Sequence, residues 1–271
     1  MLQTRQPAVA GAFYPALAAA LAHDVAALLA AAQKVTDAAA ASPKALIVPH
    51  AGYVYSGSTA ARAYARLAPV RQTIRRVVLL GPAHRVKVHG LALPGAHAFV
   101  TPLGPVEIDP VGVAAIAGLR QVTVSPAAHA LEHSLEVQLP FLQSVLDDFK
   151  LVPLAVGETT PADVAEVLDL LWGGAETLIV ISSDLSHFLP YDQAQRIDGA
   201  TAQRILALDS SLTQHQACGG APINGLLLAA RGHRLQPELI HQCNSGDTEG
   251  DRNRVVGYAS FAFTQGDRHA A

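Results

Sequence analysis

Four short apolar runs in this sequence each lead into a side chain that can do chemistry. The first two runs lead into His50 and His84, the third into Asp184 and His187, and the fourth into Cys243. Two imidazoles and a thiolate are good ligands for a transition metal, and a histidine close to an aspartate can transfer protons. The pattern predicts a metal centre with an acid–base group beside it.

The four apolar runs are expected to be strands of one sheet. They cover residues 45–48, 77–80, 178–181 and 238–240, with helical stretches between them. This alternation predicts an α/β fold, with a central, largely parallel or mixed β-sheet flanked by helices in a single domain over residues 1–271. The carboxyl ends of parallel strands form one edge, and ligands bind beyond that edge. The fold would therefore bring the five side chains together.

The remaining elements follow from capping residues, proline and apolar spacing. Helices are expected over 16–34, 58–67, 111–118, 161–172, 191–208 and 218–231. Residues 129–148 are expected to form one helix or a helix pair, with Pro140 as a kink or a fresh start. Further strands are expected at 151–156 and 255–263, a hairpin or irregular excursion over 86–110, and a small-residue connector over 38–43.

Composition narrows the function classes. The chain has 271 residues, half of them hydrophobic, and a formal net charge of -3 without a strongly basic stretch. These features argue against nucleic-acid binding. The sequence lacks a signal-peptide pattern and a convincing membrane span, so a soluble, cytoplasmic protein is expected. Because α/β chains of this length commonly form dimers, a homodimer is also expected. The two cysteines, Cys218 and Cys243, form no disulfide framework; a single bridge between them stays open, although a reducing compartment fits better.

Five segments, in order along nearly the whole chain, resemble the Memo family, which is called AmmeMemoRadiSam system protein B in bacteria and archaea. They are Pro7–Pro15, Pro49–Gly57, Gly81–His84, Glu132–Phe141 and Ser182–Phe188. That family is similar in fold to class III extradiol dioxygenases of the protocatechuate type, which use non-haem iron. The resemblance thus implies an extradiol-dioxygenase-like fold, and an AMMECR1-like protein and a radical SAM enzyme as partners.

The resemblance also implies roles for individual residues. His50 and His84 match the two histidine ligands, and the third ligand falls at Cys243. His187 matches the acid–base histidine, and Asp184 in the same loop would orient it. The implied cofactor is Fe(II) or Cu. Copper is included because a thiolate suits softer metals than a carboxylate does, and Zn is an ion that the site could acquire on purification.

His133 is a further candidate catalytic residue. With Glu136 it forms a His-x-x-Glu pair at helical spacing, and the resemblance implies that both lie behind the ligands or face the substrate. The pattern is not that of a zincin, because Val137 stands where the second histidine would be. A surface pair is the alternative interpretation.

Most of these residues could instead have a purely structural role. His50 and His84 taken singly could be strand-end histidines bonded to the backbone, and Cys243 could be a small buried hydrophobe or a reactive thiol. Cys218, before Gly219-Gly220 at an expected helix start, is interpreted as structural, although a helix N-terminus lowers a thiol pKa. Ser182 and Ser183 suggest a hydrolase, but no Gly-x-Ser-x-Gly elbow surrounds them.

The sequence is compatible with three functions. The first is a metal-dependent, dioxygenase-like oxidoreductase that acts on a small molecule. The second is a non-catalytic peptide-binding module that kept the shape of a pocket. The third is a protein that handles copper or iron without turnover.

Overall fold

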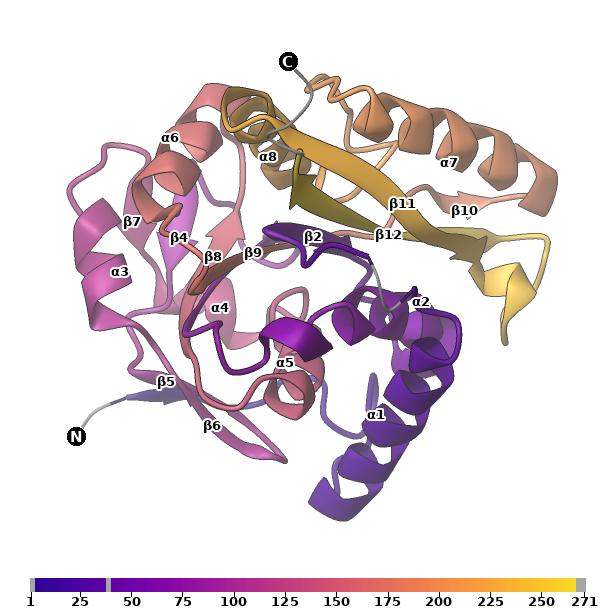
Figure 1. Ribbon diagram of the computed structural model, residues 1–271, viewed down its shortest axis with the longest axis horizontal. Helices are drawn as coiled ribbons and strands as arrows, with labels where there is room; N and C mark the ends of the chain where they lie inside the picture. Colours follow the sequence, from indigo (N-terminus) through magenta and orange to yellow (C-terminus); the bar gives the residue numbers. More distant parts are fainter. Residues whose placement is uncertain (1–2, 38–39, 267–271) are drawn as a thin grey trace.

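A mixed β-sheet forms the centre of the computed structural model, which describes residues 3–37 and 40–266 (Figure 1). Among these residues the sheet has nine strands, in the order β10-β12-β2-β9-β3-β8-β4-β7, and β11 pairs with β12. The strands are β2 (Ala45–Val48), β3 (Arg76–Pro82), β4 (Leu91–Leu93), β7 (Val122–Val124), β8 (Lys150–Val156), β9 (Thr177–Ser182), β10 (His187–Leu189), β11 (Leu235–Asn244) and β12 (Val255–Gln265).

The middle of the sheet is parallel and its margins are mixed, so the predicted α/β fold with a largely parallel or mixed sheet is confirmed. Strand β9 pairs in parallel with both β2 and β3, and β3 pairs in parallel with β8. Strand β12 is antiparallel to β2, and β4 is antiparallel to β8. Because Ile47 and Leu80 both align with Ile181, the carboxyl ends of β2, β3 and β9 meet at one edge.

Helices cover both faces of the sheet (Figure 1). On one side lie α1 (Ala18–Gln33), α2 (Tyr53–Ala65) and α5 (Leu139–Val145); on the other lie α3 (Pro110–Ile116), α6 (Pro161–Leu171), α7 (Tyr191–Leu206) and α8 (Gly220–Gly232). In β2, Leu46 and Val48 pack into the first layer, and Ala45 and Ile47 pack into the second. Burial on both faces explains why the central strands are apolar throughout.

A smaller sheet flanks the first. It has the order β1-β5-β6, with β1 (Thr4–Arg5), β5 (Ala98–Thr101) and β6 (Gly104–Glu107). Strands β5 and β6 pair in an antiparallel hairpin within residues 86–110, where a hairpin or an irregular excursion was expected. Within the described residues, no helix combines the length and the apolar character that a bilayer crossing requires.

Several boundaries differ from the predicted ones. Helix α2 begins at Tyr53, before the expected start at residue 58, and the Tyr53 backbone N–H donates to the Phe13 carbonyl at 2.8 Å. Residues 129–148, expected as one helix or a helix pair, contain the end of α4 (Pro126–Ala130), a 3-10 turn over Glu136–Gln138, and α5. Pro140 lies in the first turn of α5, so it marks the fresh start that was one of the two expectations. Of the connector expected over 38–43, residues 38 and 39 lie outside the described residues.

Candidate metal centre

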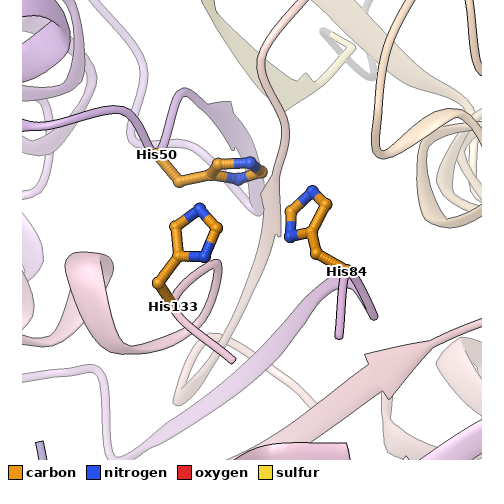
Figure 2. A group of neighbouring side chains, drawn as sticks. All are labelled: His50, His84 and His133. Carbon is orange, nitrogen blue, oxygen red and sulfur yellow. The ribbon is translucent and has the colours of Figure 1, made fainter. Parts of the chain in front are cut away.

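Three histidines from separate segments converge at the carboxyl edge of the sheet (Figure 2). His50 follows β2, His84 follows β3, and His133 lies between α4 and the 3-10 turn. One ligand atom from each histidine lies within 4.8 Å of the ligand atoms of the other two. Imidazoles grouped in this way are suited to hold a transition-metal ion.

The hydrogen bonds of His50 determine which ring nitrogen is free. Ser182 Oγ donates its hydrogen to the Ser134 carbonyl at 2.6 Å and accepts from the Gln138 amide at 2.8 Å. Ser182 Oγ must therefore accept from His50 Nδ1, 2.9 Å away, so that His50 Nε2 keeps its lone pair. Burial, reinforced by repulsion from His84, lowers the pKa of His50 to about 3 and keeps the ring neutral. Ser182 thus supports His50, an arrangement unlike that of a hydrolase nucleophile.

Glu132 holds His84 in a similar way. Its Oε1 lies 2.9 Å from His84 Nδ1, and its Oε2 accepts from the His84 backbone N–H at 2.5 Å. Burial alone would raise the pKa of Glu132, but hydrogen bonds from His84 and Ser134 outweigh it and lower the pKa to about 2. The ionised carboxylate takes a hydrogen from Nδ1, which leaves His84 Nε2 available. Carboxylates commonly orient metal-binding histidines in this manner.

His133 completes the group and has a buried nitrogen with no hydrogen-bond partner. This nitrogen is Nδ1, and Glu132 Oε1 lies 3.5 Å from it. The His133 ring stacks on His84, with centroids 4.9 Å apart, and contacts Phe13 at 4.8 Å. Burial lowers the pKa of His133 to about 4, so this ring is also neutral. The other ring nitrogen of His133 points toward His50 (Figure 2), and neutral imidazole is the form that binds metals.

Cys218 lies beside the group, where the sequence had suggested a structural role. Its Sγ is 3.4 Å from His50 Nε2, and its backbone N–H donates to the Asp184 carbonyl at 3.3 Å. Gly219 permits this approach, because a Cβ there would lie 2.6 Å from the Ser183 Cβ. Burial, and then the charge of Asp184, raise the pKa of the Cys218 thiol to about 12. Burial therefore outweighs the expected lowering of the pKa by backbone groups at the helix start, and a cation would have to displace the thiol proton.

Cys243, the expected third ligand, is placed elsewhere. Strand β11 continues through this residue instead of ending before it, and Cys243 pairs with Tyr258 of β12. Because β12 lies between β11 and β2, Cys243 is two strands, or about 10 Å, from the strand that leads to His50. Its Sγ contacts Thr59 Oγ1 at 3.2 Å. Among the described residues, the group that could hold a metal ion consists of His50, His84 and His133, and it does not include Cys243.

His187 and Asp184 line a cavity of about 440 Å3, here called the His187 cavity, which His133 also lines. Asp184 does not orient His187 as expected; its Oδ1 accepts from the His50 backbone N–H at 2.8 Å. His187 Nδ1 instead lies 2.9 Å from the Leu185 carbonyl. Because a carbonyl only accepts, Nδ1 carries the hydrogen and Nε2 can act as a base. Burial raises the pKa of Asp184.

The rest of the His187 cavity combines aromatic rings and small residues with one basic and one acidic side chain, Arg254 and Asp251. Phe13, Tyr55 and Tyr258 line it together with Arg254. The Arg254 guanidinium lies over the exposed ring of Phe188, 4.3 Å from its centroid. Phe188 has a φ of 60°, which is unusual for a residue with a side chain, and such backbone strain clusters at functional sites.

Comparison with known proteins places this architecture in one family. A family model described as Memo-like protein matches residues 5–262. MEMO1 family proteins of Archaeoglobus fulgidus and Aquifex aeolicus are 37% and 34% identical to the chain, which aligns over 96% and 97% of its length and over 99% and 100% of theirs. The chain therefore belongs to the Memo family.

A solved structure has a similar fold. It is that of an uncharacterized protein from Escherichia coli K12, with a TM-score of 0.54 over 80% of this chain and 98% of that chain. The two sequences are 16% identical, so the similarity concerns the fold alone.

Proposed function

We propose that this protein binds one Fe(II) or copper ion at His50, His84 and His133 and acts as a metal-dependent oxidoreductase on a small molecule. The observation that carries the proposal is the convergence of these three side chains, two of them with a lone pair left free on Nε2. Imidazole nitrogen is a ligand for both metals, and Mg²⁺ or Ca²⁺ would require oxygen ligands.

The donor set fits a soft or borderline metal. The Cys218 thiol, next to His50 Nε2, offers a sulfur ligand that favours copper or zinc over harder cations. When bound, the metal would supply redox chemistry and open coordination positions. Around it, Ser182 and Glu132 hold the Nδ1 side of two histidines, which fixes the direction in which Nε2 points.

The His187 cavity supports an aromatic substrate with an acidic hydroxyl. The rings of Phe13, Tyr55 and Tyr258 offer stacking surfaces to a planar molecule. His187 Nε2 would accept the hydroxyl proton and later return it. A catechol has both properties, so dioxygenase-type ring cleavage, the reaction implied by the family resemblance, is the reaction that we propose to test first.

Elemental analysis of protein purified anaerobically without chelator tests the metal centre. We expect about one iron or copper ion per chain in the parent protein, as for a single metal site. His84→Ala should lose the metal, while His241→Ala, which removes a half-buried histidine outside the group, should retain it. Equal metal content in both variants would overturn the proposed ligand set.

The two cysteines offer a second, matched comparison. Cys218→Ser should weaken metal binding by at least about tenfold, as loss of a ligand or of its neighbour does. Cys243→Ser should leave it unchanged. The reverse result would return Cys243 to the role that the sequence predicted for it.

Turnover is tested separately on the metal-loaded protein. Oxygen uptake with catechols that is lost in His187→Ala, while the metal is retained, would support the proposed role of His187. Stoichiometric metal without oxygen uptake across a catechol panel would reject the oxidoreductase and favour a metal-handling protein.

A further inference from the structure

A second cavity reaches the same group of histidines. It has a volume of about 300 Å3 and is lined by both His84 and Cys218, and it is called here the Cys218 cavity. Among the described residues, none lines both this cavity and the His187 cavity. His50 is only 2% exposed and lines neither cavity, although its ring is close to Cys218 and to His133. The candidate centre is thus accessible from two separate cavities.

The walls of the Cys218 cavity combine apolar and polar side chains. The apolar ones include Val86, Val88, Val156, Ala221 and Pro222, and Gln214 is polar but uncharged. Its charged residues, Lys87 and Glu158, have exposed side chains that pair with each other at 3.4 Å. Because these two ions pair with each other, a charged ligand would lose hydration here without gaining an unpaired ion of opposite charge, whereas a small apolar molecule would lose little. Apolar cavities in proteins take up molecules such as xenon for this reason.

We propose that the Cys218 cavity is the route by which dioxygen reaches the centre, while the organic substrate occupies the His187 cavity. The inference rests on the proposed function, because that function requires an organic substrate and dioxygen at one metal. The two cavities meet different members of the histidine group: His84 faces the first and His133 faces the second. Separate routes let dioxygen enter while the organic substrate closes the other cavity.

Thiol labelling tests the route without depending on turnover. In a Cys243→Ser background, iodoacetamide at alkaline pH, which offsets the raised pKa of this thiol, reports on Cys218 alone. Ala221→Phe should fill the Cys218 cavity and slow alkylation by about tenfold or more, since thiol reactivity depends on access. Val256→Phe adds bulk to the His187 cavity instead and should leave the rate within about twofold of the parent. Equal slowing in both variants, or slowing only in Val256→Phe, would overturn the proposed route.

Xenon then tests the apolar ligand directly. Crystals under xenon pressure should show xenon between His84 and Ala221 in the parent protein and none there in Ala221→Phe. Xenon only in the His187 cavity, or at neither place, would reject the dioxygen route. Metal content measured on the same preparations separates the two failures, because a chain that binds metal but takes up no xenon contradicts this inference alone.

Discussion

Glu132 and Glu136 lie four residues apart and are both buried, yet they serve different parts of the molecule. Glu132 is 2% exposed and contacts His84 at the candidate centre. Glu136 is fully buried and accepts hydrogen bonds from Arg5, from Tyr14 and from two backbone N–H groups at residues 8 and 9. The sequence had grouped Glu136 with His133 near the ligands, but its carboxylate faces the N-terminal segment instead.

Residues 129–136 therefore have two roles: they anchor the N-terminal segment, and they orient a histidine of the candidate centre. Arg5 donates to the Glu136 carboxylate and also to the backbone carbonyls of Glu132 and His129. The N-terminal segment is thereby held against residues 129–136, and its Phe13 reaches the His133 ring. Glu136 therefore secures the structure around the centre, and Glu132 orients a ligand within it.

The largest effect is expected from Glu136→Ala. This change leaves the buried Arg5 guanidinium without its partner, and breaking a buried ion pair costs about 3–5 kcal/mol of unfolding free energy. Chemical denaturation would measure the loss. The control is Glu158→Ala, whose exposed pairing with Lys87 should contribute less than about 1 kcal/mol. Similar losses in the two variants would contradict the anchoring role of Glu136.

A pH effect of about 3 kcal/mol is expected from His129, which lies in the same segment. Burial lowers the pKa of His129 in the folded protein to about 4, against about 6.5 for an unperturbed histidine. Between these values the unfolded chain binds more protons, so stability falls as the pH falls from 6.5 to 4, by about 3 kcal/mol in total.

Denaturation curves measured against pH test this contribution. His129→Gln should remove that part of the slope, so that the difference in stability between parent and variant changes with pH over this window. A difference that stays constant would show that His129 contributes nothing to the pH dependence.

Glu132→Gln should distinguish the two glutamates at the centre itself. The amide keeps the shape but lowers the ability to orient and polarise His84, and such changes typically cost about 10–100-fold in metal affinity. Metal titration would measure this loss. Glu136→Gln is the matched variant and should leave the affinity of the folded protein within about twofold. An equal loss in both would mean that the separation of roles is wrong.

Tyr14→Phe is expected to have the smallest effect. The hydroxyl donates one hydrogen bond to Glu136, and its removal should cost about 1–2 kcal/mol, because the acceptor is charged and buried. Metal affinity should not change. A variant of unchanged stability would show that the other three donors satisfy Glu136 without Tyr14.

Much of the fold followed from local pattern. The apolar runs before His50, His84 and Asp184 became parallel strands, because a strand buried on both faces needs apolar residues throughout. The helix expected over 161–172 also agrees with α6 to within one residue, since its capping box and its proline start lie in neighbouring residues. Helix α2 was less predictable, because a contact with Phe13, 40 residues away, accompanies its start.

The sequence by itself determined that His50 and His84 would meet at one edge of the sheet, because each follows a central strand. Only the tertiary structure decided which other side chains lie beside these two histidines. Cys243 follows the same kind of apolar run, but the order of the strands puts β12 between it and the centre. Cys218 and His133 reach the centre from loops, where no periodic pattern marks the approach. Strand order and loop path depend on contacts between distant segments, and residue spacing along the chain does not encode them.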